Sequence, residues 1–538
     1  MGDPEVRSRI SRRRFLGGGA AVAGGAAASG LLIDAAQASS IEAFRSKQLG
    51  AAALARSGRP IVTYGVQSGD ITRTSAVVWA RANRQSRMVV EVDTSETFSD
   101  ARAIRGPVAR AATDFTAQLD LSGLPPAEQL FYRVFFEDLD DRRLTSEPSV
   151  GSFRTAPVTN STLTFVWSGD TAGQGWGINP DFGGMRLYEA MRALKPDFFV
   201  HSGDTVYADG PISESVTLPD GTVWRNIVTP EKVKVAETLD EFRGNYKYNL
   251  IDPNVRSFNA EVPIFAQWDD HETLNNWYPG EILDDPLYTV TDVDLLAARA
   301  RRAFVEFMPL REQHGDPDRI YRKVAYGPLL DLFFIDMRTY RGPNTSNDQR
   351  RRSPLTAILG RRQLEWLKLQ LRSSRATWKV IASDMPLGLV VPDTETTFEG
   401  VANDHDGRAL GRELELAELL SFIKREAVDN VVWITADVHY TAAHHYDPAL
   451  ATFNDFKPFW EFVSGPINAG TFGPNELDRT FGPRVVYQRF APSPNLPPSA
   501  GLQFFGHVTI DGSSGAMTIQ LKDLEGTSLH STELEPEG

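Results

Sequence analysis

The chain has 538 residues, 41% of them apolar and 23% charged, which is an ordinary globular composition with enough material for two or more domains. Its formal net charge of −14 argues against a surface built to bind nucleic acid or an anionic membrane. It has no cysteine, which excludes disulfide bonds and any catalytic or metal-binding thiolate.

The first 38 residues have the features of an export signal. Residues 11–16, SRRRFL, fit the twin-arginine pattern, a Gly/Ala-rich apolar stretch follows, and residues 36–38, AQA, fit a cleavage site. The apolar stretch is too short and too rich in glycine for a transmembrane anchor. We therefore expect residues 1–38 to be a Tat signal peptide read by the Tat export machinery. The mature protein would then lie in the periplasm or outside the cell.

Residues 39–157 are predicted to form a lead-in followed by a small all-β domain of the fibronectin III-like kind. From about residue 60, short runs with alternating apolar residues are separated by turn residues, as in a β-sandwich. These runs are SAVVWARA, RMVVEVDTS, FTAQLDLSG, LFYRVFFED and VGSFRTAP. They contain few candidate catalytic groups, so we expect the chemistry in the rest of the chain.

Residues 158–525 are predicted to form an α/β catalytic domain, because apolar strand-like runs alternate with amphipathic helical patterns. The predicted helices are GGMRLYEAMRALK, VDLLAARARRAFVEFM and RRQLEWLKLQLRSS, and the predicted strands include TLTFVWSG, LLDLFFID, WKVIASD and NVVWITAD. GHVTIDGSSGAMTIQLKD is predicted to be a β-hairpin, and residues 526–538 a C-terminal tail. The stretches 205–260 and 385–410 are predicted to be long insertions beside the active site.

Four strand-like runs end at acidic or histidine residues. VWSGD carries Asp170, VHSGDTVY carries Asp204 and Tyr207, AQWDDHE carries Asp269, Asp270 and His271, and WITADVHY carries Asp437 and His439. In an open α/β sheet the carboxyl ends of the strands meet at one edge, where ligands bind. Adjacent carboxylates repel one another and resist burial, and a cation would explain them better than a structural role. The sequence therefore predicts a metal centre at this edge.

The order of these motifs resembles the calcineurin-like metallophosphoesterases, and more closely the PhoD-like alkaline phosphatases. The segments that carry the resemblance are GVQSGD (65–70), VVWAR (77–81), GDTVYADG (203–210), WDDHE (268–272), DMRTYR (336–341), LGRRQLEWL (359–367) and ADVHY (436–440). The resemblance implies a two-layered β-sandwich metallophosphatase core flanked by helices, with a small N-terminal β domain. It also implies hydrolysis of phosphate esters.

The resemblance also implies roles for the predicted ligands. Asp204 would bridge two metals, and Tyr207 and His439 would bind a ferric ion. Asp270 and Asp437 would bind the second metal, where hard oxygen ligands favour calcium. Fe(III) with Ca²⁺ is therefore the predicted pair, with manganese or zinc as the alternatives.

One family feature is missing from this chain. PhoD-like enzymes often have a cysteine ligand to iron after the first core strand, whereas here Gly169 and Asp170 stand at that point. Ala172 stands where the wider superfamily has a second histidine. Asp170 is therefore predicted to supply a carboxylate ligand instead.

Two such cations, roughly 3.5–4 Å apart, would activate a bridging water and polarise a phosphoryl oxygen. The resulting hydroxide would attack phosphorus in line, and His271 would protonate the leaving oxygen. Arg338, Asn275 and Trp176 are the candidates for holding the phosphate or its substituent, and Arg338 is also a candidate catalytic group.

The predicted function is thus an exported, metal-dependent alkaline phosphatase or phosphodiesterase acting on small phosphate esters or diesters. A phospholipase-D-like phosphodiesterase on the same scaffold is the alternative. A non-catalytic, calcium-stabilised surface protein is a rival from another class, and it would not need Tyr207 or His271.

Overall fold

The computed structural model describes residues 58–313 and 315–537, and the predicted export signal lies outside them. Within these residues, no helix combines the length and the apolar character needed to cross a membrane.

The larger sheet has nine strands and runs through most of the molecule. In order across the sheet they are β22 (Ser528–Leu534), β21 (Met517–Asp523), β20 (Phe504–Ile510), β8 (Leu163–Ser168), β9 (Phe198–Ser202), β12 (Ile264–Gln267), β1 (Val62–Gly69), β2 (Ser75–Ala82) and β5 (Thr116–Ser122). The central strands β8, β9 and β12 are parallel. The predicted hairpin is confirmed as β20–β21.

A second sheet of seven strands faces the first. Its strands, in order, are β13 (Arg322–Ala325), β14 (Leu330–Phe334), β15 (Trp378–Ala382), β16 (Val431–Thr435), β18 (Phe459–Val463), β17 (Thr441–Tyr446) and β19 (Pro483–Arg489). Phe165 and Val200 of the first sheet share one apolar core with Leu332 and Ile434 of the second. Trp167 Nε1 donates a hydrogen bond across this core to the carbonyl oxygen of Thr435, at 3.2 Å.

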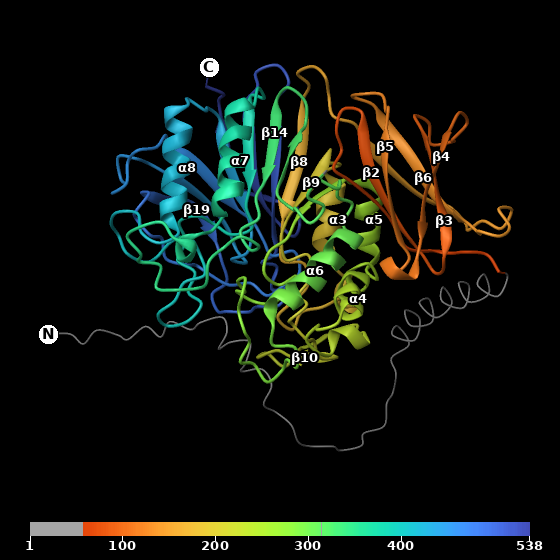
Figure 1. The fold of residues 1–538 in the computed structure, drawn as a ribbon, viewed down its shortest axis with the longest axis horizontal. Coiled ribbons are helices and arrows are strands. Elements are labelled where there is room, and N and C mark those ends of the chain that lie inside the picture. Colours follow the sequence, from red (N-terminus) through yellow and green to blue (C-terminus); the bar gives the residue numbers. More distant parts are fainter. Residues whose placement is uncertain (1–57, 314, 538) are drawn as a thin grey trace.

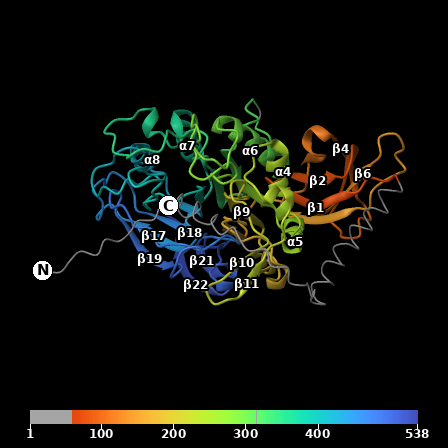
Figure 2. The ribbon, with the colours of Figure 1, turned by 90° about the horizontal axis from the view of Figure 1, so that it is seen from below.

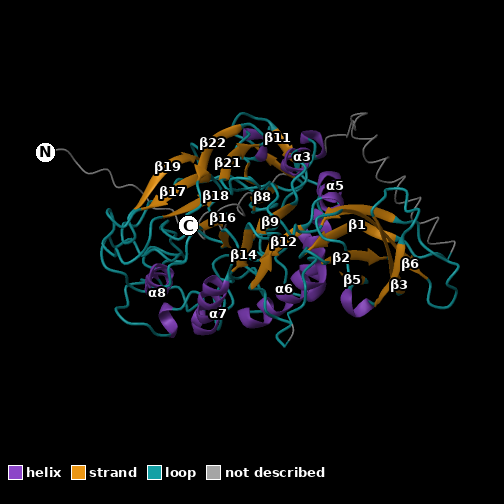
Figure 3. Ribbon diagram, turned by 90° about the horizontal axis from the view of Figure 1, so that it is seen from above, coloured by secondary structure: helices purple, strands orange, loops and turns teal. Residues whose placement is uncertain are grey.

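Helices cover the outer faces of the two sheets (Figures 1 and 3). On the first sheet they are α3 (Arg186–Ala193), α4 (Leu239–Asn249), α5 (Pro253–Glu261) and α6 (Val293–Phe307), and on the second α7 (Gly360–Ser373) and α8 (Glu413–Arg425). Phe198 of β9 lies in the core between the sheets, and Phe199 lies under the helices. Because successive side chains of a strand point to opposite faces, a strand covered on both sides reads as a continuous apolar run.

The N-terminal β structure shares a sheet with the core. A four-stranded sheet, β4 (Arg102–Ala109), β3 (Ser86–Asp93), β6 (Gln129–Glu137) and β7 (Ser149–Arg154), packs against β1 and β5. Strand β1 is hydrogen-bonded in parallel to β12 at Gly69 and Ile264. Figure 2 shows β2, β4 and β6 at one end of the molecule, with β17 and β19 toward the other.

The structure confirms the predicted fold class, an α/β two-layered core flanked by helices with an N-terminal all-β part. The stretch 205–260, however, is more than a loop: it contains the short hairpin β10 (Ser215–Thr217) and β11 (Val223–Arg225), followed by α4 and α5. Local signals for both helices exist. Thr238 and Glu241 form a capping box at the start of α4, and Asp252 caps α5 directly before Pro253.

Candidate metal centre

Each predicted carboxylate ligand follows the carboxyl end of a core strand within two or three residues. Asp170 follows β8, Asp204 follows β9, Asp270 follows β12 and Asp437 follows β16. Asp170, Asp204 and Asp437 have φ angles of 61°, 50° and 66°, in the left-handed region. Such angles are uncommon for residues other than glycine and gather at functional sites. Tight turns therefore bring side chains from both sheets to one edge.

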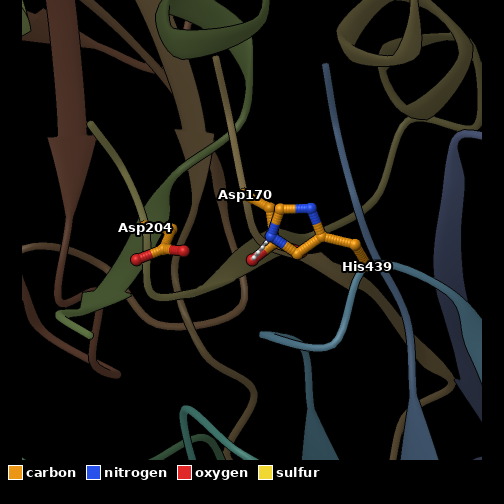
Figure 4. Close-up of side chains that lie close together, drawn as sticks. All are labelled: Asp170, Asp204 and His439. Carbon is orange, nitrogen blue, oxygen red and sulfur yellow. Dashed lines mark ion pairs between the residues drawn. The ribbon is translucent and has the colours of Figure 1, made fainter. Parts of the chain in front are cut away.

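Three groups of donor atoms lie at this edge, and the donor atoms of each group lie within 4.8 Å of one another. The groups are Asp170, Asp204 and His439; Asp204, Asp270 and His271; and Asp269, Asp270 and Asp437. Figure 4 shows the first group, in which His439 Nε2 lies 3.7 Å from Asp170 Oδ1. All of these residues are at most 2% exposed. Asp204 belongs to two groups and therefore lies where two cations could share a ligand.

Gly203 allows this crowding. It has a φ of 102°, and a Cβ atom built on it would lie 2.5 Å from Cβ of Asp269. Any larger residue would push apart the loops that follow β9 and β12.

Tyr207 and His439 meet beside Asp204. The phenolic oxygen of Tyr207 lies 2.8 Å from His439 Nε2. On the other side of the ring, His439 Nδ1 lies 2.6 Å from the carbonyl oxygen of Gly470, which can only accept a hydrogen bond. Nδ1 therefore carries the proton, and Nε2 presents its lone pair toward Tyr207. This is the tautomer that a histidine ligand requires.

The buried acidic groups of the centre would be stabilised by positive charge. Burial raises the pKa of Asp204 well above its usual value; Asp270 and Asp170 raise it further, while His271 opposes them. Burial likewise raises the pKa of the Tyr207 phenol, and the charges of Asp204 and Asp170 add to this. A bound cation would reverse both effects, since ligand groups bind metals in their deprotonated forms. The oxygen-rich donor set therefore fits hard cations.

His271 is held by Asp209, which was not among the predicted site residues. Its Nδ1 lies 2.8 Å from one carboxylate oxygen of Asp209 and 2.9 Å from the other. Burial alone would lower the pKa of His271, but the charges of Asp209, Asp270 and Asp204 outweigh it and raise the pKa well above the usual value. Asp209 lies five residues after Asp204 in the quoted motif GDTVYADG, so the sequence offered a signal for it.

Arg338 lies behind the centre, fully buried among acidic side chains. Its Nε is 2.5 Å from Asp269 Oδ1, and its Nη1 is bonded to Glu399. Its Nη2 lies 3.7 Å from Asp270 Oδ1 and 4.0 Å from Asp437 Oδ1 and makes no hydrogen bond within the described residues. The guanidinium group thus touches both carboxylates predicted for the second metal.

The other two predicted substrate residues lie on nearby loops. Asn275 donates its backbone N–H to Asp209 at 2.8 Å, and its buried side-chain amide makes no hydrogen bond within the described residues. Trp176 donates Nε1 to Asn495 at 2.8 Å and lies edge-on to Trp224. Asn275 therefore has hydrogen-bonding capacity to offer a ligand, whereas the indole N–H of Trp176 is already used.

Comparison with known proteins agrees with the predicted resemblance. Residues 165–521 match the family described as PhoD-like phosphatase, and residues 48–157 match its N-terminal domain. The chain is 28% identical over 434 residues to alkaline phosphatase D of Bacillus subtilis (strain 168). The aligned region covers 76% of this chain and 70% of that protein.

Two solved structures show the same fold. One is described as the structure of PhoD, with a TM-score of 0.66, 22% identity and 88% of each chain covered. The other is a purple acid phosphatase from yellow lupin (Lupinus luteus) seeds, with a TM-score of 0.53, 13% identity, and 89% of this chain and 74% of that one covered. The family match spans most of the core, and the chain belongs to the PhoD-like phosphatase family.

Proposed function

We propose that this phosphatase is metal-dependent and hydrolyses phosphomonoesters, phosphodiesters or both, with Fe(III) and Ca²⁺ as its cofactors. The observation that carries the proposal is the position of Asp204 in two groups of buried donor atoms. Like-charged carboxylates this close are unfavourable in a protein interior unless cations compensate them.

Asp170, Tyr207 and His439 would hold the ferric ion, and Asp270 and Asp437 the calcium ion. Asp204 would be shared between them. When bound, the two cations would activate a water molecule for attack on phosphorus and neutralise charge on the phosphoryl oxygens.

The remaining residues would act on the substrate directly. His271 carries its Nδ1 proton toward Asp209, which leaves Nε2 as the atom that donates a proton to the leaving oxygen. Asn275 would donate its side-chain amide to a phosphate oxygen, and Nη2 of Arg338, which makes no hydrogen bond within the described residues, would be a further donor to the phosphate.

The test is one preparation of the natively exported protein, measured for metal content, visible spectrum and turnover. We expect iron and calcium, a purple colour from iron bound to Tyr207, and hydrolysis of p-nitrophenyl phosphate, its bis ester, or both. A colourless, active protein with manganese or zinc would contradict the iron–tyrosinate assignment. Strong preference for the diester would favour the phospholipase-D-like alternative. A protein without turnover would contradict the proposal.

We also propose export through the Tat pathway, on the strength of the twin-arginine pattern at residues 11–16. Replacing Arg12 and Arg13 by lysine should retain the precursor in the cytoplasm, as detected by fractionation and immunoblotting. Normal export of this variant would contradict the Tat assignment.

A further inference from the structure

Glu272 connects the two loops that carry Asp204 and Asp270. Its Oε1 accepts the backbone N–H of Thr205 at 2.5 Å, and its Oε2 accepts the backbone N–H of Asp269 at 2.8 Å. Thr205 directly follows Asp204, and Asp269 directly precedes Asp270. The side chain is fully buried, so water does not compete for these bonds.

Glu272 makes these bonds beyond the point where the hydrogen bonds between strands β9 and β12 end. Strands β9 and β12 are paired up to Ser202 and Gln267, and the predicted ligands come two and three residues later. Beyond that last pair, the Glu272 carboxylate reaches both loops, with one oxygen for each. Asp204 Oδ1 and Asp209 also accept N–H groups from the loop after β12, but Glu272 alone among these three carboxylates bonds the backbone of both loops. Hydrogen bonds from N–H groups to a buried carboxylate are among the stronger ones in proteins.

We propose that Glu272 is a positioning residue that sets the separation of Asp204 and Asp270 and thereby the affinity of the centre for cations. This inference rests on the proposed metal-dependent function. Both Glu272 oxygens already accept backbone N–H groups, and Glu272 is absent from the donor groups around the centre. It therefore acts through the ligand loops.

The two hydrogen bonds that Glu272 accepts require a carboxylate group on a side chain as long as that of glutamate. A glutamine has the same shape, but it has only one acceptor oxygen, and its NH₂ group would face one of the two N–H donors. An aspartate keeps the charge, but its side chain is one carbon shorter and would reach one loop rather than both. Both variants should therefore loosen one of the two loops.

The test compares Glu272→Gln with Glu415→Gln in the full chain. Glu415 is a matched control because it is also a buried carboxylate that accepts backbone N–H groups, those of Ile358, Leu359 and Gly360. It lies on α8, away from the ligand loops. Calcium affinity is measured by isothermal titration of chelator-treated protein, and turnover of p-nitrophenyl phosphate is measured over a range of calcium concentrations.

We expect Glu272→Gln to weaken calcium binding by about 10- to 100-fold, the usual effect of removing a group that orients metal ligands. Excess calcium should restore most of kcat, and Glu415→Gln should bind calcium like the wild type. Calcium affinity of Glu272→Gln equal to that of the wild type would overturn the proposal. So would an equal loss in Glu415→Gln.

Two further outcomes are decisive. If Glu272→Gln does not fold, Glu272→Asp should fold and bind calcium more weakly; failure of both variants to fold in excess calcium would assign Glu272 to folding and overturn its positioning role. A wild-type protein that binds neither calcium, manganese nor iron would instead overturn the proposed metal centre itself.

Discussion

His271 and Asp209 form a buried pair in which Nδ1 of the imidazole lies within 2.9 Å of both carboxylate oxygens. A carboxylate at this position fixes the tautomer of the imidazole and favours its protonated form, as required of a group that donates a proton to a leaving oxygen.

Replacing Asp209 by asparagine should therefore lower the pKa of His271. Activity that needs protonated His271 is lost as the pH rises through this pKa, so the alkaline limb of the kcat/KM profile should move to lower pH. The measurement is a pH–rate profile with p-nitrophenyl phosphate. Asp220→Asn, on the exposed turn between β10 and β11, is the control and should leave the profile in place. An unmoved profile for Asp209→Asn would show that His271 does not set this limb.

Replacing Tyr207 by phenylalanine removes the phenolic oxygen but keeps the buried ring. If that oxygen binds Fe(III), the purple absorption should disappear and the iron content should fall, as measured by visible spectroscopy and elemental analysis. Tyr248→Phe is the control, because the Tyr248 hydroxyl is also buried but donates to the backbone carbonyl of Ile227. Colour that persists in Tyr207→Phe would exclude Tyr207 as the iron ligand.

Replacing Gly173 by alanine should displace Tyr207. A Cβ atom at Gly173 would lie 2.2 Å from Cγ of the Tyr207 ring, so the ring or the loop must move. We expect loss of iron and of turnover from a protein that still folds, as checked by circular dichroism. Gly407→Ala is the control, since its nearest contact would be the His405 carbonyl oxygen at 3.6 Å. Full activity in Gly173→Ala would mean that Tyr207 needs no fixed position.

Asp70 and Arg322 tie the N-terminal β structure to the core through a buried ion pair of 2.8 Å. Replacing Asp70 by asparagine leaves the Arg322 charge without its counter-charge and should lower the free energy of unfolding by about 3–5 kcal/mol. The control is Asp120→Asn, which breaks a more exposed pair with Arg311 and should cost about 0–1 kcal/mol. Denaturant titration measures the free energy of unfolding of both variants. An equal loss in the two would contradict the structural role of the Asp70–Arg322 pair.

The lowered pKa of the buried His201 should make the stability of the protein depend on pH. Burial lowers its pKa to about 3, so between about pH 3 and 6.5 the unfolded chain binds a proton that the folded protein does not. Stability should fall as the pH falls through this window, and His201 should contribute about 2 kcal/mol of loss between about pH 7 and pH 5. The measurement is the free energy of unfolding of the wild type and of His201→Gln at several pH values, both in chelator. If the two proteins lose stability equally as the pH falls, the contribution assigned to His201 is contradicted.

The metal-ligand candidates could be predicted from the sequence because each lies shortly after a strand that reads as a continuous apolar run. Asp204, Asp437 and their neighbours could be assigned to one edge by topology alone. Glu399 could not be assigned in this way, because it reaches Arg338 across 61 residues of chain from within a stretch that lacks strand or helix periodicity. Such pairings depend on how the loops fold over the sheets.

The same limit applies to Arg338. The motif DMRTYR indicated a residue near the pocket, but only the structure shows that Asp269 and Glu399 already take up two of its nitrogen atoms. A phosphate contact from Arg338 would have to come from Nη2.

The parallel pairing of β1 with β12 also bears on any attempt to produce the catalytic part alone. A chain that began after residue 157 would lose the pairing of Gly69 with Ile264 and would uncover this side of β12, only a few residues from Asp269 and Asp270. Exposed strand edges recruit other chains and promote aggregation. The N-terminal β structure thus covers this side of β12, and a shortened protein would need another cover there to avoid aggregation.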